Sequence, residues 1–130
     1  MRRALLDTSV FIAREQGRRI EDPDPEPDEV AVSVVTLAEL EQGVLLAPDD
    51  GSRAIRLETL VAAREEAIGL DVDQEVASTY ARLAAEAARA GSSPRINDAW
   101  IAATALAHGV PLVTQDADFE RFQGLQVIQV

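Results

Sequence analysis

Four acidic residues in this 130-residue sequence are spaced so that they could meet at one site. Each follows a short apolar run or stands near the start of a helical one, and they are Asp7, Glu39, Asp98 and Asp116. Carboxylates held close together repel, and burial disfavours their charged forms. A hard divalent cation relieves both penalties by taking carboxylate oxygens as ligands, so the pattern predicts a Mg²⁺ or Mn²⁺ site.

Such ions keep several waters and accept phosphate oxygens, and the chemistry they support is phosphodiester hydrolysis. One ion activates a water for attack on phosphorus, and the same or a second ion stabilises the leaving oxygen. Histidine is not required: the only one, His108, ends an apolar helical run and is expected at the surface. Ser9 lacks a histidine partner, and cysteine is absent, which excludes thiol catalysis, disulfides and zinc–thiolate sites.

Each acid also has a plainer interpretation. Glu39 completes Thr36-x-x-Glu39, the pattern of a capping box that serves only a helix end. Asp98 could complement the dipole of its helix, or Asn97 could cap that helix. The other two acids could be ordinary turn residues. Their joint occurrence at strand ends and helix starts favours one shared site.

Further polar residues adjoin the four acids in the sequence. Thr8 and Thr114 could orient a carboxylate or a ligand water, although hydroxyls at strand and helix ends usually serve as local caps. Asp118 could add a further carboxylate or could serve the start of a helix before Phe119. Together with Asn97, these residues are candidates for support of the metal ligands.

Apolar periodicity indicates the elements that must position these residues. Expected strands are Arg3–Leu6, Val30–Val34, Leu112–Val113 and a terminal edge strand, Leu125–Val130. Expected helices follow the first strand as far as Gly17 and then cover Thr36–Ala47, Ser52 to about Ile68, Asp73–Ala90 and Asp98 to Gly109. The helix from Ser52 presents one apolar side made of Ile55, Leu57, Leu60 and Val61. Trp100 is expected in the core.

Alternation of strands and helices predicts an α/β fold, a three-layer α/β/α sandwich with a mainly parallel central sheet, in a single domain over residues 1–130. Ligands of such sheets bind beyond the carboxyl ends of the strands, where Asp7 and Asp116 are expected. The segment Glu21–Glu29 holds three prolines and six acids, which predicts an exposed loop.

Composition limits the function classes. The net charge of -11 argues against passive binding to nucleic acid, so any such contact must be local. A hydrophobic content of 47% is enough for one core. No secretory signal or membrane span is expected, and cytoplasmic residence is the default.

The motifs around the four acids resemble those of a known family. LLDTSVFI, SVVTLAELEQG, NDAWIAATALAHGVPLVT and TQDADF are similar, in this order, to the signatures of PIN-domain ribonucleases, and most of all to VapC toxins of bacterial toxin–antitoxin pairs. The resemblance implies a PIN fold and a Mg²⁺- or Mn²⁺-dependent endoribonuclease whose acidic quartet is Asp7, Glu39, Asp98 and Asp116. It further implies a homodimer, a VapB-type antitoxin partner, and structured RNA such as transfer RNA or a ribosomal RNA loop as substrate.

Two other readings remain open at the level of the sequence. One is a PIN-fold nuclease outside toxin–antitoxin systems. The other is a non-catalytic α/β module whose acidic cluster binds only protein partners, and metal dependence would separate it from a nuclease.

Overall fold

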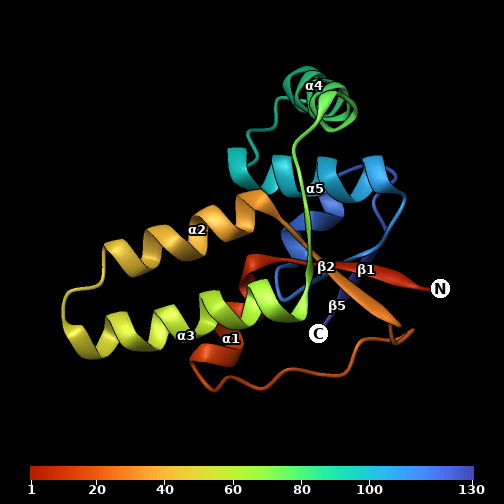
Figure 1. The fold of residues 1–130 in the computed structure, drawn as a ribbon. Helices are drawn as coiled ribbons and strands as arrows, with labels where there is room; N and C mark the ends of the chain where they lie inside the picture. Colours follow the sequence, from red (N-terminus) through yellow and green to blue (C-terminus); the bar gives the residue numbers. More distant parts are fainter.

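A five-stranded parallel sheet in the order β3-β2-β1-β4-β5 forms the centre of the computed structural model, which describes residues 1–130 (Figure 1). The strands are β1 (Arg3–Leu6), β2 (Glu29–Ser33), β3 (Ile68–Leu70), β4 (Leu112–Thr114) and β5 (Val127–Gln129). The helices are α1 (Thr8–Glu15), α2 (Val34–Leu45), α3 (Asp50–Glu66), α4 (Gln74–Arg89), α5 (Ile96–His108) and the short 3-10 helix η1 (Ala117–Arg121). The predicted α/β sandwich is confirmed.

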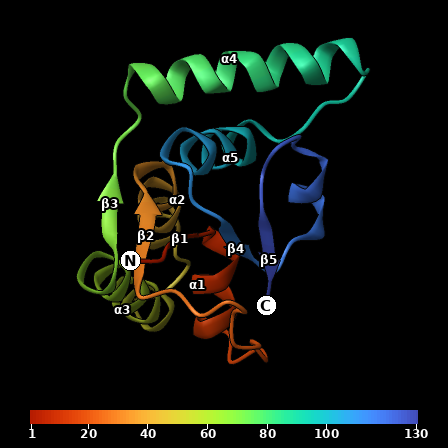
Figure 2. The same cartoon turned by 90° about the vertical axis from the view of Figure 1, so that its right-hand side faces the viewer.

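Alternate residues of each strand pack into two separate cores. Ala4 and Leu6 belong to the core shared with α1, α2 and α3, whereas Leu5 belongs to the core shared with α4 and α5. Because both faces of the sheet are covered, the central residues of its inner strands are apolar, as is typical of parallel sheets. In Figure 2, α5 lies over the sheet and α4 lies across α5.

The strand order places a switch point beside β1. The chain runs from β1 outward to β2 and β3, and it later returns to add β4 and β5 on the other side. At this junction Leu6 of β1 stands opposite Val113 of β4. Ligands of open α/β sheets bind in the crevice at such a point, beyond the carboxyl ends of the strands.

The sequence-based prediction missed β3 and therefore extended the preceding helix too far. The helix ends at Glu66, and Ile68–Leu70 pairs with β2 as an edge strand. Three residues are too few to show a strand period. On α3 only Leu60 of the expected apolar side is buried, while Ile55, Leu57 and Val61 are exposed.

Helix α4 has a capping residue at each end. The Asp73 carboxylate accepts a hydrogen bond from the backbone N–H of Val76 at 2.9 Å, and Gly91 follows the helix with a φ of 68°. Gly109 likewise ends α5 with a φ of 64°, a left-handed conformation that favours glycine. The single histidine, His108, is exposed at the last position of α5, as expected.

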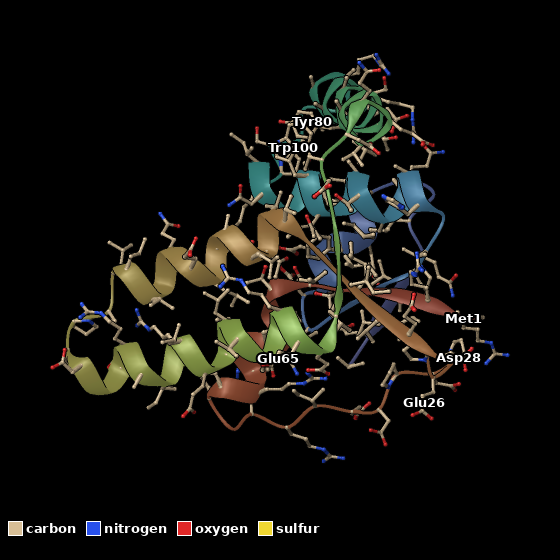
Figure 3. The ribbon with its side chains drawn as sticks, in the orientation of Figure 1. Met1, Glu26, Asp28, Glu65, Tyr80 and Trp100 are labelled. Atoms are coloured by element: carbon tan, nitrogen blue, oxygen red, sulfur yellow. The ribbon has the colours of Figure 1, made fainter.

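Trp100 lies between α4 and α5 rather than deep in the core. Its ring stacks on that of Tyr80 with centroids 3.8 Å apart and an angle of 10° between the planes (Figure 3). The indole is half-buried and packs against the edge of the core. A stacked aromatic pair contributes about 0.5–1.5 kcal/mol beyond its buried area, so this contact helps to hold α4 on α5.

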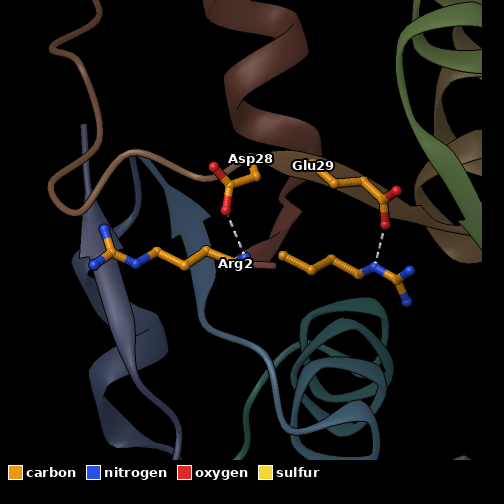
Figure 4. A network of polar contacts seen from close by, with 4 residues as sticks. Arg2, Asp28 and Glu29 are labelled. Atoms are coloured by element: carbon orange, nitrogen blue, oxygen red, sulfur yellow. Dashed lines mark hydrogen bonds and ion pairs between the residues drawn. The ribbon is translucent and has the colours of Figure 1, made fainter.

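The acidic, proline-rich segment is an exposed loop, as predicted, except at its last residue. Glu29 is the first residue of β2, and its carboxylate pairs with the guanidinium of Arg3 on β1. Asp28 accepts a hydrogen bond from the backbone N–H of Arg2 at 2.8 Å (Figure 4). These two contacts join the end of the loop to the first strand.

No helix of the structure combines the length and apolar character needed to cross a membrane.

Candidate metal centre

Asp7 directly follows β1 at the switch point and is 4% exposed. Its Oδ2 atom accepts hydrogen bonds from the Ser9 hydroxyl at 2.6 Å, the Thr114 hydroxyl at 2.8 Å and the Ser9 backbone N–H at 3.4 Å. Its Oδ1 atom accepts none from the protein. Asp7 is therefore the N-cap of α1, and it keeps one oxygen available to a ligand.

Ser9 and Thr114 connect the start of α1 to the end of β4. Their hydroxyl oxygens are 3.2 Å apart, and the Ser9 oxygen accepts the backbone N–H of Gln115 at 3.0 Å. Thr114 also accepts the backbone N–H of Asp116 at 3.0 Å. The predicted role of Thr114 in orienting a carboxylate agrees with these contacts. Ser9 is not among the residues that the sequence predicts for the site, although its place two residues after an N-cap aspartate is a local signal for this network.

Glu39 is half-buried one turn into α2, and it does not form the capping box that the sequence allowed. The helix begins at Val34, and Ser33 is its N-cap, so Thr36 lies inside the first turn. The Thr8 hydroxyl is 2.8 Å from Oε1 of Glu39 and 2.9 Å from the hydroxyl of Thr36. A hydroxyl has one proton, and because the Glu39 carboxylate can only accept, Thr8 donates to Glu39 while its oxygen can accept the proton of Thr36. Glu39 is thereby held toward α1 rather than toward its own helix end.

Asp98 lies in the first turn of α5, near the other three acids. The helix begins at Ile96 with Arg95 as its N-cap, so the alternative that Asn97 caps the helix is wrong. Asn97 is exposed and its side chain forms no hydrogen bond within the protein. The boundary differs because Arg95 caps without a side-chain hydrogen bond, which leaves no sequence signal.

The environment of Asp98 shows that the four acids share one electrostatic site. Burial raises the pKa of this carboxyl to about 6, with further increases from the charges of Asp7, Asp116 and Glu39. Arg95 acts in the opposite direction and lowers the pKa. The Asp98 side chain accepts no hydrogen bond from the protein, so nothing in the fold compensates its charge fully.

Asp116 follows β4 and is the N-cap of η1. Its Oδ1 atom accepts the backbone N–H of Asp118 at 2.9 Å. Asp118 is exposed in the first turn of η1, which agrees with the helix-start role considered for it, and it lines a small pocket together with Asp98. The turn interpretation of Asp116 is thus correct locally, but it does not explain why Asp116 lies close enough to Asp98 for its charge to raise the pKa of Asp98.

The donor atoms of these residues suit a hard cation, whereas their present arrangement is not that of a complete metal site. The donors are all oxygens, as Mg²⁺ and Mn²⁺ prefer, and their mutual repulsion would be relieved by positive charge. In the present side-chain conformation, however, no three acidic or histidine side chains are arranged around a common point. A single ion held by three of the carboxylates therefore requires changes of rotamer, while one or two carboxylates with water ligands do not.

Comparisons with known proteins agree with this fold. Residues 4–125 match the PIN domain family. Ribonuclease VapC5 of Mycobacterium tuberculosis is 46% identical over 126 residues, which cover 97% of this chain and 92% of that protein. Ribonuclease VapC4 of the same organism is 45% identical over 132 residues, covering 100% and 98%.

Similarity extends to a solved structure. A chain in the crystal structure of VapBC-5, a member of the VapBC family of toxin–antitoxin systems from Mycobacterium tuberculosis, superposes with a TM-score of 0.83 at 41% identity, with complete coverage of both chains. Both the sequence match and the superposition therefore include all four acidic positions. This protein belongs to the PIN-domain family and is a relative of the VapC ribonucleases.

Proposed function

We propose that this protein is an endoribonuclease toxin of VapC type that needs Mg²⁺ or Mn²⁺ and cleaves structured RNA. The observation that carries the proposal is the proximity of Asp7, Glu39 and Asp116 to Asp98 at the switch point, where the charges of all three raise the pKa of Asp98. A group whose pKa is raised both by burial and by neighbouring charges marks a candidate functional site. Related proteins are named ribonucleases, which supports RNA as the substrate class.

In this proposal the four carboxylates hold the ion, directly after changes of rotamer or through water ligands, and neighbouring hydroxyls position two of them, Asp7 and Glu39. Asp7 is fixed by Ser9 and Thr114 through Oδ2, so Oδ1 is the oxygen that accepts the ion. Glu39 is held at the site by Thr8. When bound, a divalent ion supplies Lewis acidity toward phosphate oxygens and lowers the pKa of water. The carboxylates of the chain bind the metal ion, and the hydroxyl groups of the chain orient those of Asp7 and Glu39.

We also propose a VapB-type antitoxin as the protein partner, and a homodimer as the assembly. Solved relatives that are described as VapBC complexes support the first. Large apolar side chains on α2, on α3 and in the turn between them support an interface: Leu45 and Leu46 are 73% and 71% exposed, and Ile55, Leu57 and Val61 are exposed as well. Sedimentation of the isolated chain and of the complex with its antitoxin tests both assemblies.

The enzymatic proposal is tested by incubating the purified, antitoxin-free protein with total RNA and mapping the new RNA ends. Cleavage is expected with Mg²⁺ or Mn²⁺ and not with a chelator. Asp98→Asn should abolish it, because the amide keeps the size of the side chain and loses the anionic ligand. Asp22→Asn is the matched control, since it removes one charge from the exposed acidic loop, and it should cleave normally.

Metal binding itself is measured by thermal denaturation. An ion present at a hundredfold excess over its dissociation constant should stabilise the wild type by about 2.7 kcal/mol. Asp98→Asn should show a much smaller shift. A wild type whose melting is insensitive to both ions would instead support a non-catalytic acidic module.

A further inference from the structure

A small pocket opens beside Asp98, between the segment that leads into α5 and the 3-10 helix η1. Four of its lining residues are charged, namely Arg95, Asp98, Asp118 and Arg121. Arg95 stands three residues before Asp98, and Arg121 stands three residues after Asp118. Two guanidinium groups from separate segments thus adjoin one edge of the acidic site.

These two arginines have no partner within the protein, in contrast to most of the arginines elsewhere. Five arginines form ion pairs with acidic side chains, namely Arg3, Arg14, Arg53, Arg64 and Arg82. Arg56 donates to the backbone carbonyl of Gly43 at 2.7 Å. Arg95 and Arg121 form neither kind of contact, so all their donors are available to a ligand.

The pocket has the size for a small anion, and its lining carries two guanidinium groups beside the carboxylates of Asp98 and Asp118. Its volume of about 160 Å³ is well below the roughly 300–1,000 Å³ of pockets that enclose drug-sized molecules. Guanidinium donors match the paired oxygens of a phosphate group. In a chain of net charge -11, a phosphate backbone can be attracted only where positive charge is concentrated locally.

We propose that this pocket binds a backbone phosphate of the RNA next to the phosphate that is cut, with Arg95 and Arg121 as its donors. The inference rests on the proposed ribonuclease function, because Asp98 belongs both to the acidic site and to the pocket wall. A phosphate held here sets the position of the adjoining phosphodiester against the carboxylates. Arg95 and Arg121 are therefore binding residues of the substrate path.

The test measures the initial rate of RNA cleavage, at subsaturating RNA, over a series of salt concentrations. Arg95→Gln and Arg121→Gln should each lower kcat/KM about tenfold or more, because each removes a charge-assisted hydrogen bond. Each should also reduce the slope of log kcat/KM against log salt by about 0.7, the contribution of one phosphate contact on a single strand. Arg18→Gln is the control, since Arg18 is exposed after the far end of α1 and has no ion pair.

Two further variants separate binding from a purely structural role. Arg95→Lys and Arg121→Lys retain the charge, and they should recover the salt slope while recovering the rate only in part, since the forked geometry is lost. Thermal melting of every variant shows whether it is folded. A structural role would change the melting temperature and leave the salt slope as in the wild type.

The outcomes distinguish this inference from the proposed function. If the wild type cleaves RNA while both Gln variants keep its rate and salt slope, the pocket is not a phosphate site and the ribonuclease proposal stands. If those variants cleave RNA normally but no longer bind the antitoxin, the pocket serves a protein partner and the inference is wrong. If the wild type cleaves no RNA with either metal, the proposed function fails and this inference fails with it.

Discussion

Asp98→Asn should stabilise the metal-free protein, although it is expected to abolish the activity. The carboxylate of Asp98 accepts no hydrogen bond from the protein, so the substitution removes charge without breaking one. Burial, followed by the charges of Asp7, Asp116 and Glu39, raises the pKa of Asp98 from 3.8 to about 6. The folded state therefore disfavours the ionised form, and an amide of the same shape avoids this penalty.

The size of the gain follows from the pKa shift. A change of about two pKa units corresponds to about 3 kcal/mol. Because Asp98 is only half-buried, solvent screening reduces this to about 1.5 kcal/mol. Loss of an acidic residue from the first turn of α5 opposes the gain by about 0.3–1 kcal/mol. A net stabilisation of about 1 kcal/mol remains, which corresponds to about 3–5 °C in Tm for a chain of this length.

The pH dependence of the gain has a definite sign. The folded-state pKa of Asp98 lies above its unfolded value, so the penalty is complete above about pH 6 and disappears below about 3.8. The advantage of Asp98→Asn should thus be full at pH 7.5, about half as large at pH 5 and small near pH 4. Acid removes the penalty by protonating the wild-type carboxyl.

Urea denaturation in the presence of a chelator, at pH 7.5 and pH 5, measures this difference. Glu75→Gln is the control, because Glu75 is an exposed acid in the first turn of α4 and reports the loss of a dipole interaction alone. It should lose a few tenths of a kcal/mol at both pH values. A destabilised Asp98→Asn variant at pH 7.5, or a gain independent of pH, would refute the electrostatic reasoning.

Two other substitutions test the scaffold of the site. Thr114→Val should destabilise the protein by about 1–3 kcal/mol in thermal or urea unfolding, because it removes both a donor to Asp7 and the acceptor of the Asp116 N–H. Thr104 is the control, because its buried hydroxyl donates only to a backbone carbonyl of its own helix, and Thr104→Val should lower the free energy of unfolding by less. Equal losses in the two variants would show that the contacts of Thr114 with Asp7 and Asp116 add no stability beyond an ordinary hydroxyl contact. Gly43→Ala should stabilise α2 by about 0.5–1 kcal/mol, since the nearest atom to an added Cβ is a side-chain carbon 3.9 Å away. An unchanged or lower Tm for that variant would contradict it.

The elements nearest the site were the most predictable from sequence. The apolar run before Asp7 and the end of the apolar helix at Gly109 have strong local signals, and the structure confirms both positions. Starts of α2 and α5 were placed two residues late, because the real caps, Ser33 and Arg95, lie at the ends of strand and loop segments rather than at the first obvious polar residue. Edge strand β3 was missed because three residues carry no period.

The sequence by itself determined the parallel α/β fold and the types of residue at the strand ends, since apolar periodicity and the positions of carboxylates are local properties. Which of two local roles Glu39 and Asp98 take was decided only by tertiary structure. The strand order β3-β2-β1-β4-β5 places β1 next to β4. Helix α1 then brings Thr8 into contact with Glu39 and Ser9 into contact with Thr114. The same packing buries Asp98 among like charges and brings Arg95 beside Arg121. Contacts between segments far apart in the chain depend on the strand order, which no local pattern encodes.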